Sequence, residues 1–229
     1  LYIMLDVCNY SLEYTVCGFK NHMSPDDHYA DLKRVIAAAG GKARRINVIM
    51  PFLYESRQHK RTGRESLDCA LMLQELTDMG VENIITFDAH DPRVHNAIPL
   101  KGFESVSCTY QFIKYLLLNV DDLHIDSELK KRGASRVFCA TTFGLFTNGF
   151  KKFDEAYENG IIDRILTTNL VYQPTELLSK PWYINVDMSK YMALLIDTLN
   201  HDSSISNLLS PVERIQQRVK EYNELHYGK

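Results

Sequence analysis

Two apolar stretches set the predicted fold: Ile46-Asn-Val-Ile-Met-Pro-Phe-Leu53 and Asn83-Ile-Ile-Thr-Phe-Asp88. Short, nearly continuous apolar runs of this kind are typical of strands buried on both faces of a parallel sheet. A helical pattern from about Glu65 to Met79 separates the two stretches and stops at Gly80. A strand, a helix and a second strand in this order predict a parallel crossover unit.

The same alternation continues over the rest of the chain. The sequence Ser24-Pro25-Asp26-Asp27 has the cap, the first-turn proline and the acidic residues of a helix start, and this helix is expected to end at Gly40-Gly41. Alternating strands and helices predict an α/β fold with mainly parallel sheets flanked by helices. The other expected strands are Leu1–Val7, Arg136–Thr142, Ile161–Thr168 and Trp182–Val186, and the other expected helices are Tyr110–Leu118, a short one closed by Lys130–Gly133, Met188–Leu199 and Val212–Leu225.

Each of the first two strands is followed by a loop that suits a ligand. The loop after the first strand carries four cations, which suit phosphate groups: Arg57, Lys60, Arg61 and Arg64. The second strand ends in Asp88-Ala-His90-Asp91, which offers a carboxylate and an imidazole to a hard metal ion. Because open α/β sheets bind ligands at the carboxyl ends of their strands, the two loops together indicate nucleotide chemistry.

Less specific interpretations apply to the same residues. A loop with four cations is more often a solvated surface than a binding site, and a single Asp-x-His is a weak metal signal. His90 could instead be a capped histidine that orients the turn. We expect His95 to lie on the surface, and His59 to be exposed and to take no part in proton transfer. The position at strand ends and the presence of Gln58 favour the ligand interpretation.

Composition limits the class of function. The 229 residues are 45% hydrophobic and 24% charged, which is enough for one large or two small domains. A net charge of −3 gives no general attraction to nucleic acid or to an anionic membrane, and no apolar run approaches the ~20 residues of a membrane span. Five cysteines without a Cys-x-x-Cys pair, most of them in apolar runs, indicate buried thiols and a cytoplasmic location.

The order of several motifs resembles the ribose-phosphate pyrophosphokinase (phosphoribosyl pyrophosphate synthetase) family. Members carry an Arg-Gln-Asp-Lys/Arg-Lys loop after a strand, and Ser56–Arg61 is similar to it. Members also carry Asp-Leu-His-Ala at the end of the next strand, to which Asp88–Asp91 is similar. The remaining similar segments follow in the family's order: Arg136–Phe146, Thr168-Asn169, Ile184–Asp187 and His201–Ser206.

The resemblance implies two type I phosphoribosyltransferase-like domains, residues 1–108 and 109–229. It implies an ATP- and Mg²⁺-dependent kinase of nucleotide biosynthesis, a transferase that moves the β,γ-diphosphoryl group of ATP to the 1-hydroxyl of ribose 5-phosphate. It also implies a homo-oligomer that binds neither nucleic acid nor membrane; the amphipathic segment Val212–Leu225 would lie on its own domain or form an oligomer contact. Under this resemblance, ATP would be bound by Arg57, Gln58, Lys60 and Arg61, and Mg²⁺ by Asp88 and His90.

The chain also departs from the family pattern. His59 stands where the family usually has Asp. Residues Asp91–Asn96 replace a segment, usually Ala-(Ser/Gly)-Gln-Ile-Gln-Gly, that in the family borders an allosteric phosphate site, so we do not expect that regulation. Between Asp122 and Glu128 the sequence lacks the family's Pro-Asp-x-Gly loop, its lysine-bearing flexible loop and its Asp-Asp…Thr-Gly-Gly-Thr phosphoribosyl loop. The main catalytic residues therefore remain unassigned.

Two explanations fit the absence of these three loops. Either the protein itself has lost them, or the 229 residues leave out loops that the whole protein contains. A deleted phosphoribosyl-binding strand would leave a parallel sheet without a central member, so we favour omission of loops that become ordered with ligand. The alternative function is a non-catalytic homologue that associates with such an enzyme and regulates it. A plain type I phosphoribosyltransferase is a weaker third reading, because those enzymes need no ATP loop.

Overall fold

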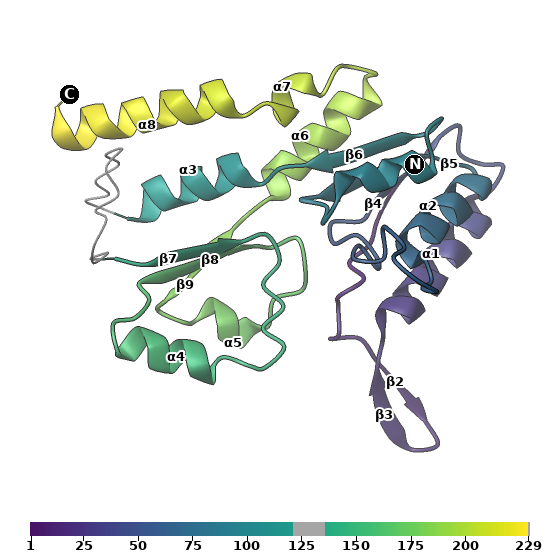
Figure 1. Cartoon of the computed structure of the whole chain (residues 1–229), viewed down its shortest axis with the longest axis horizontal. Coiled ribbons are helices and arrows are strands. Elements are labelled where there is room, and N and C mark those ends of the chain that lie inside the picture. The colour runs from purple at the N-terminus through teal and green to yellow at the C-terminus, as the bar shows by residue number, and fades with distance from the viewer. Residues whose placement is uncertain (121–135, 229) are drawn as a thin grey trace. The chain divides into compact units, whose positions relative to one another are not determined.

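The computed structural model describes residues 1–120 and 136–228 (Figure 1). The chain divides into two compact units. Unit 1 comprises Leu1–Ser107 with Leu170–Tyr172, and unit 2 comprises Cys108–Asn169 with Gln173–Lys229. The assignment of residues 1–108 and 109–229 as functional domains stays a prediction. The block expected between Asp122 and Glu128, and the short helix closed by Lys130–Gly133, lie outside the described residues.

Unit 1 is built on a four-stranded sheet in the order β1-β4-β5-β6. All three neighbouring pairs are parallel, with Val48 opposite both Ile3 and Ile84. The α/β class with mainly parallel sheets is therefore confirmed for this part of the chain. The strands are β1 (Tyr2–Met4), β4 (Ile46–Ile49), β5 (Val81–Phe87) and β6 (Gly102–Val106).

Two helices and one short 3-10 turn cover one face of this sheet. They are α1 (Pro25–Ala39), α2 (Asp68–Asp78) and η1 (Pro92–Ala97). The shared core joins Leu32 of α1, Leu73 and Leu76 of α2, and Val48 and Ile84 of the strands, all of them almost fully buried. Side chains spaced for a helix thus meet side chains from alternate positions of the strands, as a helix-on-sheet layer requires.

The start of α1 follows the sequence signal closely. The side chain of Ser24 accepts a hydrogen bond from the backbone N–H of Asp27 (3.2 Å), and the N–H of Ser24 donates to Asp27 Oδ2 (2.8 Å). This reciprocal pair satisfies amide groups that the first turn leaves without helical partners. The helix ends at Ala39, before Gly40, as predicted.

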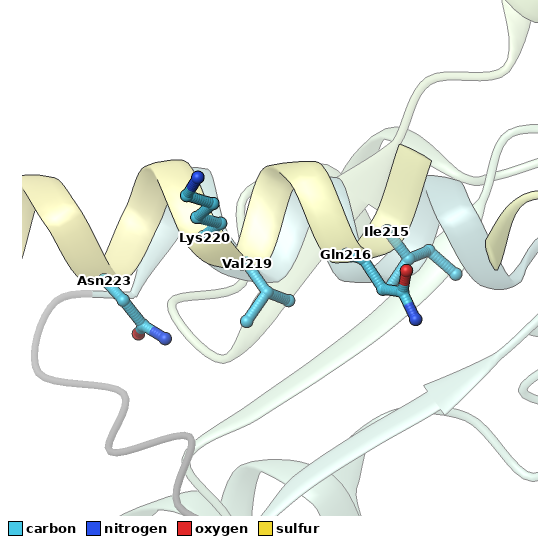
Figure 2. A pocket seen from close by; sticks show the side chains of 5 residues that line it. All are labelled: Ile215, Gln216, Val219, Lys220 and Asn223. Carbon is cyan, nitrogen blue, oxygen red and sulfur yellow. The ribbon is translucent and has the colours of Figure 1, made fainter. Parts of the chain in front are cut away.

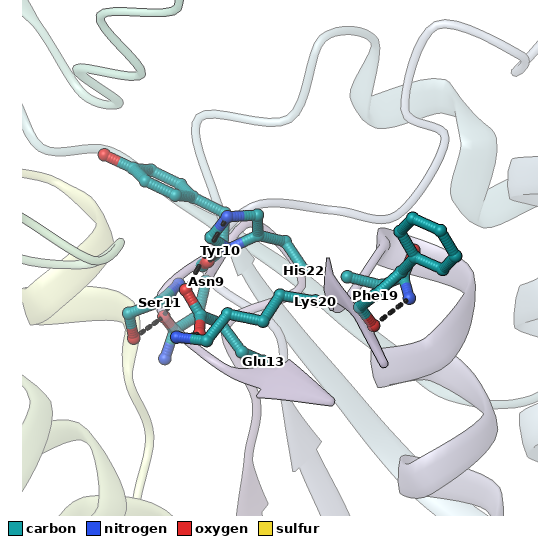
Figure 3. Close-up of polar contacts among 8 residues, drawn as sticks. Asn9, Tyr10, Ser11, Glu13, Phe19, Lys20 and His22 are labelled. Carbon is teal, nitrogen blue, oxygen red and sulfur yellow. Dashed lines mark hydrogen bonds and ion pairs between the residues drawn. The ribbon is translucent and has the colours of Figure 1, made fainter. Parts of the chain in front are cut away.

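A two-stranded hairpin, which the sequence did not predict, separates β1 from α1. Its strands are β2 (Glu13–Val16) and β3 (Phe19–His22). Cys17 and Gly18 connect them with φ angles of 50° and 83°, the positive values that tight hairpin turns favour. Lys20 donates to Glu13 at 2.9 Å across the hairpin (Figure 3). Phe19 is 75% exposed, so the hairpin adds no core to unit 1.

Unit 2 contains a three-stranded parallel sheet in the order β7-β8-β9. Its core centres on the fully buried Trp182, whose indole N–H donates to Asp154 at 2.7 Å, while Lys180 donates to the same carboxylate at 2.9 Å. The elements are β7 (Phe138–Thr141), β8 (Arg164–Thr168), β9 (Tyr183–Val186), α3 (Thr109–Asn119), α4 (Lys151–Glu158), α5 (Thr175–Leu178), α6 (Ser189–Asn200), α7 (Ser206–Leu209) and α8 (Val212–Tyr227).

The amphipathic helix α8 packs on α3 of its own unit. The Tyr222 hydroxyl donates to the carbonyl of Val120 at 3.0 Å, and the Arg214 guanidinium lies 4.1 Å from the centre of the Tyr110 ring. Another side of α8 borders a shallow surface hollow of about 400 Å³ (Figure 2). Its lining side chains are Ile215, Gln216, Val219, Lys220 and Asn223.

Several sequence expectations need correction. Strand β4 ends at Ile49 and not at Leu53, because Pro51 cannot donate to a ladder. Strand β6 was missed, since Gly-Phe-Glu-Ser-Val lacks an apolar run; a Cβ at Gly102 would lie 1.9 Å from Asn83 Oδ1, so a larger residue there would force the Asn83 side chain to move. Helix α4 was also missed. Among the cysteines, Cys69 and Cys108 are buried, Cys8 is partly buried, and Cys17 and Cys139 are exposed.

Within residues 1–120 and 136–228, no helix is both long and apolar enough to cross a bilayer.

Replacing Leu76 with alanine should destabilise unit 1 strongly. Leu76 is 0% exposed, so Leu76→Ala removes buried contacts and leaves a cavity, at a cost of about 2–5 kcal/mol in the free energy of unfolding. The control is Leu71→Ala in the same helix, where the side chain is 54% exposed and the change should be under about 1 kcal/mol. Denaturant unfolding measures both; equal losses would contradict the observed packing of α2.

A second prediction concerns the contact between α1 and α2. Glu75 accepts from the Tyr29 hydroxyl (2.6 Å) and from Lys33 (2.9 Å), and these bonds lower the pKa of Glu75. A carboxyl group whose pKa is lower in the folded state stabilises that state fully when the pH is above the group's pKa in the unfolded chain. This stabilisation is lost as the pH falls through the pKa of the folded state. Glu75→Gln should therefore lower Tm at pH 7, and the difference from wild type should shrink in acid. Glu82→Gln, at an exposed position in β5, is the control and should show no such trend.

Candidate functional site

The carboxyl ends of β4 and β5 are joined beyond the ladder itself. The backbone N–H of Met50 donates to the carbonyl of Ile85 at 2.9 Å. The carbonyl of Pro51 accepts from the N–H of Phe87 (3.1 Å) and from the Thr86 hydroxyl (3.0 Å). The start of the basic loop is therefore held against the last residues of the neighbouring strand.

The basic loop then turns back on itself. The N–H of Ser56 donates to the carbonyl of Leu53 at 3.2 Å, and the N–H of Gln58 donates to that of Glu55 at 2.7 Å. Glu55 has a φ of 49°, which marks a tight turn. The side chain of Gln58 is partly buried, whereas the loop's cations, Arg57, Lys60, Arg61 and Arg64, are exposed and make no ion pair with any described residue.

The second loop begins at Asp88, which has a φ of 40°. Its N–H donates to the carbonyl of Val106 at 3.0 Å, and the next N–H, of Ala89, donates to the Ser105 hydroxyl at 3.0 Å. Both acceptors belong to the end of β6, so these bonds fix the backbone at the start of the loop. The side chains of Asp88 and His90 are exposed at the end of a buried strand, where they are accessible to a ligand.

The two loops meet at His59 and Asp91. Nε2 of His59 lies 3.3 Å from Oδ2 of Asp91, and the His59 ring packs edge-on against the His90 ring at a centroid distance of 5.3 Å. The side chain of His59 is only 9% exposed, so the expectation that it is exposed was wrong. The reason is tertiary, because the buried environment comes from the loop after β5, about 30 residues further along the chain. His95 is exposed, as expected.

Asp91 is held from its other side as well. The Arg93 guanidinium donates to both carboxylate oxygens, at 2.9 Å to Oδ1 and 2.5 Å to Oδ2, and the Arg93 N–H donates to Oδ1 at 3.0 Å. These bonds hold the pKa of Asp91 well below its usual range. The carboxylate thus remains charged and caps η1. Sequence reasoning treated His59 and Asp91 as separate departures and did not find that they meet.

Metal binding by Asp88 and His90 stays a prediction, as does ATP binding by Arg57, Gln58, Lys60 and Arg61. Across the described residues, no group of three or more His, Cys, Asp or Glu side chains could hold a metal ion. One carboxylate and one imidazole nevertheless suit Mg²⁺, which takes few protein ligands and completes its shell with water and phosphate oxygens. The hollows lined by α8 in unit 2 include none of the residues of the basic loop.

The backbone at Asp88 yields a prediction. An alanine at a φ of 40° is strained, whereas glycine adopts this conformation readily. Asp88→Gly should therefore be more stable than Asp88→Ala by roughly 0.5–1 kcal/mol, measured by denaturant unfolding. The matched control is the same pair of substitutions at Glu82, inside β5 and outside the left-handed region, where glycine should be the less stable.

Three comparisons with known proteins bear on this chain. Residues 2–80 match the family model described as the N-terminal domain of ribose phosphate pyrophosphokinase. The chain is 28% identical over 160 residues to ribose-phosphate pyrophosphokinase 1 of Schizosaccharomyces pombe, an alignment that covers 62% of this chain. It spans only 38% of the length of that relative.

The fold has a counterpart among solved structures. The phosphoribosylpyrophosphate synthetase of Mycobacterium smegmatis superposes with a TM-score of 0.67 at 14% identity, covering 88% of this chain and 99% of that one. At this identity the match supports the fold alone. Residues 2–80 therefore match a domain of ribose phosphate pyrophosphokinase, the chain is similar in sequence to one such enzyme, and it shares the fold of a phosphoribosylpyrophosphate synthetase.

Proposed function

We propose that this protein acts in ribose-phosphate pyrophosphokinase chemistry and that unit 1 binds ATP with Mg²⁺ at the carboxyl ends of β4 and β5. One observation carries the proposal. The cationic loop starts at the end of β4, where it is hydrogen-bonded to β5, and Asp88 and His90 follow directly after the last residue of β5. Phosphate-binding and metal-binding groups on neighbouring strand ends are what a nucleotide triphosphate site requires.

The proposed reaction transfers the β,γ-diphosphoryl group of ATP to the 1-hydroxyl of ribose 5-phosphate and yields phosphoribosyl pyrophosphate and AMP. Such a transfer depends on positioning and on charge stabilisation more than on covalent chemistry by the protein. Arg57 offers a planar, permanently charged fork to phosphate oxygens. Gln58 is partly buried and can orient the nucleotide through its amide, and Lys60 and Arg61 can neutralise the charge that develops on the transferred group.

A magnesium ion at this site would neutralise phosphate charge and bridge phosphate oxygens. Asp88 would hold it directly, and His90 would contact it directly or through water. The exposure of both side chains leaves room for the metal's remaining water and phosphate ligands. Asp88 keeps a carboxylate at a backbone position that glycine would occupy with less strain, which supports a role for the charge itself.

A non-catalytic homologue that associates with an active synthetase is the second candidate. It is favoured by the absence from the sequence of the family's phosphoribosyl loop, which would bind ribose 5-phosphate. In either role we propose a cytoplasmic homo-oligomer whose small-molecule partners are nucleotides and, for the enzyme, ribose 5-phosphate. Nucleic acid and membranes are not proposed as partners.

Removal of the Arg57 guanidinium should weaken ATP binding. A lost charge-assisted hydrogen bond corresponds to ~1.5–3 kcal/mol, or roughly 10- to 150-fold in Kd. Calorimetric titration of Arg57→Ala with ATP and Mg²⁺ measures this, and the melting temperature should change little because an exposed cation adds little stability. Arg44→Ala is the matched control, since Arg44 is also exposed but precedes the opposite end of β4. Equal affinity of both variants would leave the basic loop as a solvated surface.

The two candidate functions predict different activities. Protein expressed from the natural gene, with ATP, Mg²⁺ and ribose 5-phosphate at saturation, should form phosphoribosyl pyrophosphate, and Asp88→Ala should abolish it at a small cost in stability. Protein limited to the 229 residues should bind ATP but form no product, because the sequence has no ribose 5-phosphate loop. Product formation can be followed by chromatography of AMP and phosphoribosyl pyrophosphate. An inactive natural protein would support the regulatory homologue.

A further inference from the structure

Two departures from the family pattern contact one another in unit 1. His59 stands where the family usually has an aspartate, and Asp91 stands where it usually has an alanine. We propose that His59 and Asp91 act as positioning residues, a cross-loop pair that fixes the basic loop relative to Asp88 and His90. For its ligand, this inference rests on the proposed function; for its geometry, it rests only on contacts within unit 1.

The Asp91 side of the cross-loop pair is rigid. Both oxygens of the carboxylate accept from the Arg93 guanidinium, and Oδ1 also accepts from the Arg93 N–H. The turn that Asp91 caps places Val94 in the core, where it is 4% exposed. The Asp91 carboxylate is therefore held by Arg93 and belongs to a turn that is anchored in the core through Val94.

The His59 side ties down the middle of the basic loop. Its ring is 91% buried, lies 3.3 Å from Asp91 and packs on the His90 ring. Nδ1 is buried and has no hydrogen-bond partner among the described residues, so the contact through Nε2 is the polar interaction that holds the ring. The candidate phosphate-binding side chains lie immediately before and after this residue in the chain.

The pair thus restricts a loop that otherwise has few contacts. An unrestricted loop would lose conformational entropy on binding a nucleotide, and this loss would reduce affinity. A loop already held at His59 presents its cations at a defined place beside the end of β5. The two residues also depend on each other, because an aspartate at position 59 would bring a second carboxylate up to Asp91.

Limited trypsin digestion of the ligand-free protein tests the geometry. Arg57, Lys60, Arg61 and Arg64 are exposed cleavage sites, and mass spectrometry identifies each cut. His59→Leu keeps the bulk but removes the imidazole nitrogens that lie against Asp91, and it should raise cleavage in this loop about tenfold, the effect of ~1.4 kcal/mol. His59→Gln restores a polar side chain that can reach Asp91 and should restore most of the protection. Cleavage after Arg44, which is outside the loop, should be equal in all variants.

A double-mutant cycle distinguishes a direct interaction between His59 and Asp91 from two independent effects on the mobility of the loop. Asp91→Ala alone should raise loop cleavage, because it removes the partner of His59. In the Asp91→Ala protein, the further substitution His59→Leu should raise cleavage in the loop by less than about twofold. A full tenfold further increase would show that His59 acts independently of Asp91 and would overturn the proposal.

Titration of the same proteins with ATP and Mg²⁺ separates this inference from the proposed function. His59→Leu should weaken ATP binding several-fold, with recovery in His59→Gln. If wild-type protein binds no ATP but its loop is protected by the pair, the proposed function fails and the cross-loop pair stands. If wild-type protein binds ATP but His59→Leu is cleaved no faster than wild type, the proposed function stands and the cross-loop pair is overturned.

Discussion

The pairing of β4 with β5 is the constraint on which unit 1 depends. Both strands are buried, so their polar backbone groups must find partners inside the sheet. Pro51 interrupts the ladder because it has no N–H, yet its carbonyl accepts from both Phe87 and Thr86. The pairing therefore extends past the last formal residue of β4. The basic loop after β4 and the loop with Asp88 and His90 after β5 therefore begin at the same edge of the sheet.

The hydrophobic layer behind this edge explains how polar loops can be placed there without loss of stability. Helices α1 and α2 pack on one face of the sheet and bury the strand side chains that point to it. The core of unit 1 is therefore formed mainly by these helices and strands. The loops are free to carry exposed cations and an exposed carboxylate, since charged groups at the surface contribute little to stability. Among the described residues of the two loops, the largely buried side chains of His59 and Asp91 form the contact that links one loop to the other.

The departures from the family pattern noted in the sequence lie in the loops after β4 and β5 and between Asp122 and Glu128. Residues 2–80, which include β1, α1, β4 and α2, match the model of the family's N-terminal domain. The basic loop and the Asp88–His90 turn keep residues suited to nucleotide binding. The sequence contains no equivalent of the loop that would bind the sugar phosphate. ATP binding and catalysis are thus separable questions for this protein.

Local sequence signals identified the parallel crossover and the capped start of α1, because apolar runs and helix caps are determined over a few residues; ligand binding by the two loops stays a prediction. The same signals missed β6, which has no apolar run and pairs with β5 so that Gly102 lies opposite Asn83. They also missed the hairpin β2–β3, whose turn has a cysteine at positive φ. The burial of His59 could not be foreseen, because its partner Asp91 belongs to another loop. Contacts between segments distant in the chain arise only when the sheet brings their ends together.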